Sequence, residues 1–154
     1  MTTPASVAPS TSGAPLSRQA AMQQLLAGIA EDQAGYNAML GLLEEQFIAA
    51  LRHQSARLGE LAELISAAVD VLEARRSRRV ALAKSLLGPT PTMAQVFALL
   101  KPEPRARQER DWQALEQTVQ ECKRIGKRNS DLLLEQYSIM QRVLHGEDQT
   151  YEPA

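Results

Sequence analysis

The C-terminal third of the chain carries the most informative pattern of apolar and polar positions. Residues 105–145 contain no proline and a single glycine, which favours one long helix. Spacing these residues at about 100° around a helix axis places the apolar ones on two stripes rather than one. The first stripe consists of Trp112, Leu115, Val119, Cys122, Leu133, Tyr137, Met140 and Leu144. The second stripe, on its shoulder, consists of Ile125, Leu132, Ile139 and Val143. Because a helix packed along one seam needs only the first stripe, the second predicts a further helix, supplied by the fold or by a partner.

The N-terminal half carries a longer seam that breaks once. Apolar residues follow one another at spacings of four and three, with one polar member: Met22, Leu26, Ile29, Gln33, Tyr36, Leu40, Leu43, Phe47 and Ala50. This spacing predicts a helix over 17–52, with Ser17 as its N-cap. The seam restarts one residue out of phase at Leu58, and an unbroken helix over 17–87 would be roughly 105 Å long. We therefore predict a turn within 52–56 and a second helix over 55–87 that is capped by Ser55.

Glycine and proline mark the remaining boundaries. Residues 88–91 (Gly-Pro-Thr-Pro) end the second helix, and Thr92 followed by Gln95 has the spacing of a capping box, which predicts a short helix over 92–100. Pro104 suits the first position of the last helix, over 104–145. The predicted fold is all-α, an elongated antiparallel bundle or coiled-coil hairpin of three long helices and one short helix over 17–145. We expect a disordered low-complexity start, 1–16, and a flexible tail, 146–154.

Charge and cysteine content limit the classes of partner and compartment. A formal net charge of −1 gives no field that would attract nucleic acid or an anionic membrane. The single cysteine excludes an intramolecular disulfide and fits a reducing compartment. No apolar run reaches the roughly 18 residues of a membrane span, and the start lacks the basic and apolar regions of a secretion signal. We expect a cytoplasmic protein that is not embedded in a membrane.

Candidate chemical groups are few and scattered. Cys122 lies on the first stripe, while His53 and His145, the only histidines, lie in a predicted turn and near a helix end. We interpret the cysteine as a packed thiol rather than a nucleophile or metal ligand. Carboxylates on the long helices are typical of solvated faces or of i,i+4 partners of arginine. We therefore expect no enzymatic activity, no metal site and no cofactor.

Polar residues interrupt the seams at two places. The basic cluster at 75–79 (Arg-Arg-Ser-Arg-Arg) is typical of a solvated helix face, with contact to an acidic partner or to nucleic acid as alternatives. Because Arg75 and Arg79 fall on the seam, either the seam loosens there or their stems pack while their heads reach acidic neighbours. Asn129 lies on the seam of the last helix, where a buried asparagine fixes register at a cost in stability. Gly126, one turn earlier, permits close approach of another backbone.

Three groups of residues carry a family resemblance. They are Leu82, Ser85, Leu87 and Gly88 at the end of the second helix; Asp111-Trp112-Gln113-Ala114-Leu115, Asn129-Ser130 and Leu132-Leu133-Leu134 in the last helix; and Thr150-Tyr151 in the tail. In order and spacing they resemble the FlgN family, whose members are flagellar type III export chaperones for hook-associated proteins. The resemblance extends over roughly residues 20–151.

The resemblance implies partners and a mechanism. The cargo would be the amphipathic terminal helix of a hook-associated (hook–filament junction) protein, which the chaperone keeps from assembling early and delivers to the flagellar export apparatus. Such a helix would lie against an apolar surface, and the second stripe is our candidate for it. By the same resemblance, Tyr151 would dock on the export gate.

Two other functions remain open from the residues alone. A structural coiled-coil or adaptor protein would bury the second stripe by self-association, and homo-oligomers are possible in either case. A nucleic-acid-binding regulator would instead use the arginine cluster, and its affinity would fall steeply with salt.

Overall fold

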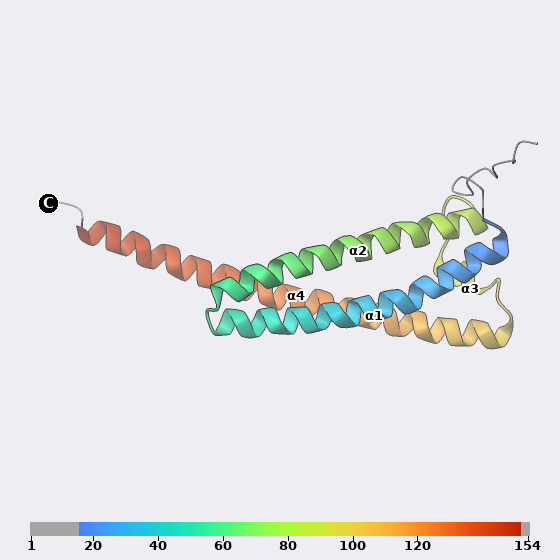
Figure 1. Cartoon of the computed structure of the whole chain (residues 1–154), viewed down its shortest axis with the longest axis horizontal. Helices are drawn as coiled ribbons and strands as arrows, with labels where there is room; N and C mark the ends of the chain where they lie inside the picture. Colours follow the sequence, from blue (N-terminus) through green and yellow to red (C-terminus); the bar gives the residue numbers. More distant parts are fainter. Residues whose placement is uncertain (1–15, 152–154) are drawn as a thin grey trace, which may run out of the picture.

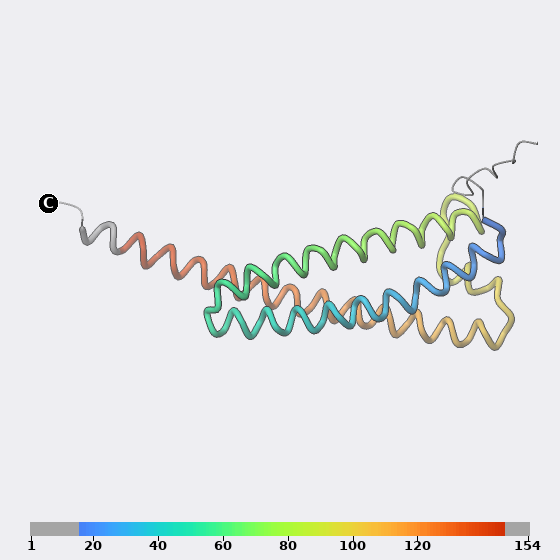
Figure 2. The backbone as a smooth tube through the Cα atoms, viewed as in Figure 1, coloured from blue at the N-terminus to red at the C-terminus, as the bar shows by residue number. Residues whose placement is uncertain are grey.

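The computed structural model describes residues 16–151, and their side chains as far as Gly146 (Figures 1 and 2). The expected disordered start, 1–16, falls almost entirely outside the described residues, as does the end of the expected tail.

Three long helices and one short helix make up the described chain, which contains no strand (Figure 1). They are α1 (Arg18–Leu51), α2 (Ser55–Leu87), α3 (Met93–Phe97) and α4 (Pro102–Tyr151). The predicted all-α, elongated fold is confirmed. Within the described residues α1 packs against both α2 and α4, while α3 lies at one end of the bundle between α2 and α4.

The direction of each helix follows from its contacts with α1. Six hydrogen bonds join α4 to α1, from Gln33 with Thr118 through to Gln136 with Ala50, and their partners stay 83 to 86 residues apart. A nearly constant offset means that α4 runs in the same direction as α1. Contacts between α1 and α2 instead join residues that are 54 apart in the sequence at Gln24 and only 12 apart at Glu45. This falling separation means that α2 runs opposite to both other long helices.

The turn between α1 and α2 lies where the seam fails. Ser17 Oγ accepts a hydrogen bond from Ala20 N (3.1 Å) and caps α1, as expected. At the other end His53 has a φ of 55°, a conformation that non-glycine residues rarely adopt. The expected cap at Ser55 is wrong: Gln54 holds the N-cap position and makes no side-chain cap, because the chain enters α2 one residue earlier.

The boundaries of α3 and α4 depend on capping residues, prolines and a glycine. Thr92 and Gln95 form the expected capping box. The last helix begins at Pro102 rather than Pro104, since backbone N–H groups in a first turn have no helical partner and a proline there loses nothing. It continues past residue 145 to Tyr151, because a single glycine, Gly146, costs only about 1 kcal/mol against alanine.

Two clusters of buried apolar side chains form the core. The larger lies at the α3 end and consists of Ala21, Leu25, Ile29, Leu82, Ala83, Leu86, Val96, Phe97 and Leu115. The smaller lies nearer the α1–α2 turn and consists of Met39, Leu43, Leu72, Cys122 and Ile125. The larger cluster uses residues from all four helices and the smaller from α1, α2 and α4, and α1 is the element that packs on both other long helices.

Candidate functional site

The end of α4 extends past the rest of the bundle. Gln136 Nε2 donates a hydrogen bond to Ala50 O (3.0 Å), and α1 ends at the next residue, Leu51. Beyond this point α4 continues past the end of α1, as its red segment shows in Figures 1 and 2. We call residues 137–146, the part with described side chains, the projecting end.

The projecting end and the residue positions just before it expose several large apolar side chains. Between 46% and 65% of each is accessible to solvent, and all except Leu134 belong to one of the two stripes: Leu134, Tyr137, Ile139, Met140, Val143 and Leu144. This exposed cluster of large apolar side chains is a candidate interaction surface. Its cause is geometric, since the face of α4 that packs on α1 keeps its apolar pattern after α1 has ended.

The four residues proposed for cargo binding divide between core and surface. Ile125 is only 5% exposed and packs with Met39 and Leu43 of α1. Leu132 is half-buried, whereas Ile139 and Val143 are 46% and 54% exposed. The second stripe therefore begins as core and becomes surface. Tyr151, the expected docking residue, is the last residue of α4, and its side chain lies outside the described residues.

Asn129 anchors α4 to α1 just before the projecting end. Its Nδ2 donates to Leu43 O (2.7 Å) and to Gln46 Oε1 (2.9 Å), and it is 1% exposed. Next to it, Arg128 pairs with Glu44 (3.2 Å). The prediction that Asn129 is buried is confirmed. Its hydrogen-bond partners on α1 fix the offset between the two helices.

Gly126 does not bring another backbone close, contrary to expectation. A Cβ built there would meet no atom within 4 Å, apart from its chain neighbours and the helix's own backbone. The position faces open space because α2, the other long helix, does not reach this side of α4.

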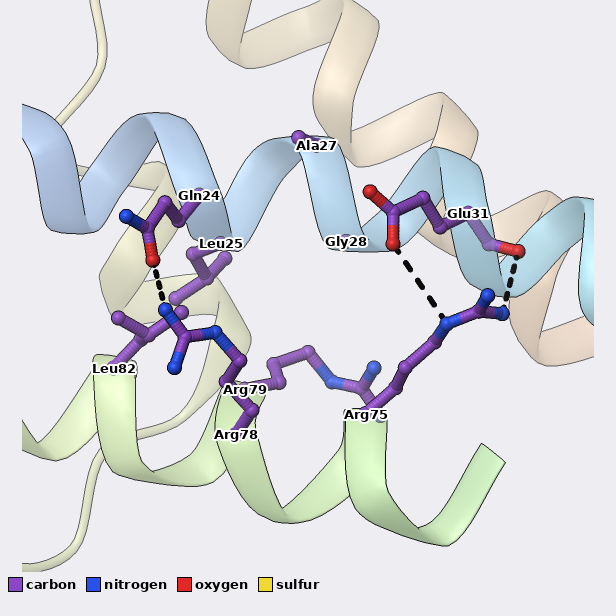
Figure 3. A pocket seen from close by; sticks show the side chains of 9 residues that line it. All are labelled: Gln24, Leu25, Ala27, Gly28, Glu31, Arg75, Arg78, Arg79 and Leu82. Atoms are coloured by element: carbon purple, nitrogen blue, oxygen red, sulfur yellow. Dashed lines mark hydrogen bonds and ion pairs between the residues drawn. The ribbon is translucent and has the colours of Figure 1, made fainter. Parts of the chain in front are cut away.

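The arginine cluster joins α2 to α1. Figure 3 shows Arg75 and Arg78 extending from α2 to Glu31 and Gln24 of α1. Arg79 forms an ion pair with Asp32 and lies over the ring of Trp112, 5.2 Å from its centre. The solvated-face interpretation is therefore wrong for Arg79, whose side chain is 17% exposed. The other interpretation, heads that reach acidic neighbours, is confirmed.

The comparison with protein families decides the identity of the chain. The family described as FlgN protein matches residues 21–146, which include the core, the arginine cluster and the whole projecting end. The chain belongs to the FlgN family. Comparisons with curated proteins and with solved structures find no match.

FlgN is a family of flagellar export chaperones and is not enzymatic. In this FlgN chain the pKa of Cys122 is raised, first by burial and then by the charge of Glu121, so the thiol is a poor nucleophile. Among the described residues no three His, Cys, Asp or Glu side chains gather as metal ligands. Within the same part of the chain, no helix is long and apolar enough to cross a membrane.

Proposed function

We propose that this FlgN chain binds the amphipathic terminal helix of hook-associated flagellar proteins through the projecting end of α4. The observation that carries the proposal is the group of half-exposed apolar side chains that α4 carries beyond the end of α1. An amphipathic helix packs its apolar face on such a surface through side chains at i, i+3, i+4 and i+7. Leu132, Ile139 and Val143 contact the cargo, and Ile125 supports them from the core.

Binding of this kind would account for chaperone action. A cargo helix whose apolar stripe is covered cannot pair with a second copy of itself, so premature assembly is blocked. Release then needs only separation of two helices rather than refolding of either protein.

The test is calorimetric titration with a synthetic peptide that spans the terminal helix of a hook–filament junction protein. We expect saturable binding with a negative change in heat capacity, the mark of apolar burial. Ile139→Asp with Val143→Asp should weaken binding at least tenfold while the helical signal and melting temperature persist, because both residues are exposed. The matched control is Ser138→Asp with Arg142→Gln, which changes the net charge by the same amount on the polar side of the same segment. Unchanged affinity in the first pair, or equal loss in both, would refute the proposed surface.

Delivery to the export gate is a separate step, for which we propose Tyr151. Tyr151→Ala should leave peptide affinity unchanged and weaken binding to the cytoplasmic part of the gate. Equal losses in the two assays would contradict separate roles for the two surfaces.

Self-association is the alternative that the same surface allows. Sedimentation would then show a tight dimer or trimer whose state does not change when cargo peptide is added. That result together with no peptide binding would replace cargo binding as the function of the projecting end.

A further inference from the structure

An apolar groove runs between α2 and α4. Both helices pack on α1, yet within the described residues their backbones do not approach each other, and they meet through side chains, as where Arg79 of α2 lies over Trp112 of α4. The space between them is an open cavity of about 450 Å³, with Met39 and Leu43 of α1 as its floor, Ile65 and Val69 as its α2 wall, and Val119 and Cys122 as its α4 wall. We call this space the α2–α4 groove.

The α4 wall of the groove leads into the projecting end. Steps of four and three residues from Val119 pass through Lys123, Gly126, Ser130 and Leu133 to Tyr137, so these residues share one face of the helix. Gly126 and Ser130 leave a gap on this face. A Cβ built at Gly126 would meet no atom within 4 Å, apart from its chain neighbours and the helix's own backbone. Groove and projecting end form one continuous surface.

The size of the projecting end argues that its ligand uses the groove as well. Six apolar side chains, each about half exposed, offer on the order of 500 Å², whereas a standard interface buries about 800 Å² on each partner. Extending the contact along α4 to Val119 supplies the remainder. The element that fills a gap between two long helices of a bundle is a further helix.

We propose that the α2–α4 groove holds the continuation of the cargo's amphipathic helix, which becomes the fourth helix of the bundle. This inference rests on the proposed function and extends its site from α4 to α2. Opposite Gly126 and Ser130 the cargo carries a large apolar side chain that fills the gap. Two charges of opposite sign, Glu73 and Lys123, line this part of the groove, so burial of apolar surface rather than net charge drives binding, and affinity changes little with salt.

The first test places a charge on the α2 wall, which is remote from the projecting end. Val69 is 47% exposed and lines the groove, while Val71 is 49% exposed and lies about 200° around the same helix. Val69→Arg should weaken binding of the terminal-helix peptide at least tenfold, and Val71→Arg should leave it unchanged. Both variants should melt as the native chain does.

The second test fills the gap on α4. Gly126→Leu puts a side chain into the space meant for cargo, and it stabilises the helix because leucine is a better helix former than glycine. We expect an unchanged or higher melting temperature together with at least tenfold weaker peptide binding. Gly41→Leu is the control: a Cβ at Gly41 also meets nothing within 4 Å, and the position lies opposite Met39 and Leu43 on α1.

The outcomes separate this inference from the proposed function. If Ile139→Asp with Val143→Asp abolishes binding while Val69→Arg and Gly126→Leu bind normally, cargo stays on the projecting end and the groove proposal is overturned. If the native chain binds no peptide, the proposed function fails first. If Gly126→Leu changes only the sedimentation of the protein, the groove belongs to a second copy of the chain, which also overturns the proposal.

Discussion

At the scale of single residues, the carboxylate of Asp32 governs how α1 and α2 pair. Its side chain is 2% exposed and lies between Arg79, with which it forms an ion pair, and Arg75, 4.0 Å away. Burying charges is costly, and it is tolerated here because two guanidinium groups compensate one carboxylate. These two ion pairs favour the observed register of α2 on α1.

Removal of this carboxylate gives the prediction for the residue scale. Asp32→Ala should lower the free energy of unfolding by about 3 kcal/mol, because it leaves the guanidinium of Arg79 partly buried and unpaired. Glu31→Ala is the control, since Glu31 is 61% exposed and its loss should cost less than about 1 kcal/mol. Urea denaturation measures both, and a similar small loss in the two variants would show that the buried pair contributes little.

At the scale of elements, the seams predicted which segments are helical, and boundaries were predicted where a residue type or a break in a seam decides them. Ser17, Thr92 and Gly88 act through their own side chain or freedom of φ, so each could be read from the sequence. The turn at His53 has no such signal, because a histidine with positive φ is held there by the packing of two helices on either side.

The strained turn gives the prediction for the element scale. His53→Gly should raise the free energy of unfolding by about 0.5–1 kcal/mol, since glycine adopts a φ of 55° without steric cost. Gln54→Gly, at a φ of −87°, relieves no strain and should destabilise the chain slightly. Thermal unfolding of the two variants would contradict this account if both moved in the same direction.

Contacts between elements were much harder to predict than the elements. Spacing shows that Ile125, Ile139 and Val143 share a stripe, but it does not show where the neighbouring helix ends, and so it could not separate core from surface. The ion pair of Asp32 with Arg79 joins residues 47 apart, and no local pattern pairs them. The α2–α4 groove escaped prediction for the same reason.

At the scale of the whole molecule, α4 belongs to two environments. Its first part packs on α1 in a fixed parallel register, and its projecting end exposes apolar side chains beyond the end of α1. The first part of α4 therefore carries the stability of the bundle, and the projecting end contributes little to it.

This separation can be tested by truncation. A chain that ends at Tyr137 should keep the urea midpoint of the full chain, because the described part of the removed segment, 138–146, buries no core residue, and it should lose affinity for the cargo peptide. Helical signal should fall only in proportion to the residues removed. A large drop in midpoint would show that the projecting end folds back on the bundle in solution.

The uncovered continuation of α4 also sets how its backbone amides exchange with solvent. Residues near Asn129 can open only when α4 leaves α1, whereas amides in the projecting end can open by fraying of the helix end alone. Deuterium uptake should therefore form a gradient along a single unbroken helix, slow near Asn129 and fast past Gln136. A bound helix would remove that gradient, so deuterium uptake in the projecting end would show whether the chaperone is occupied.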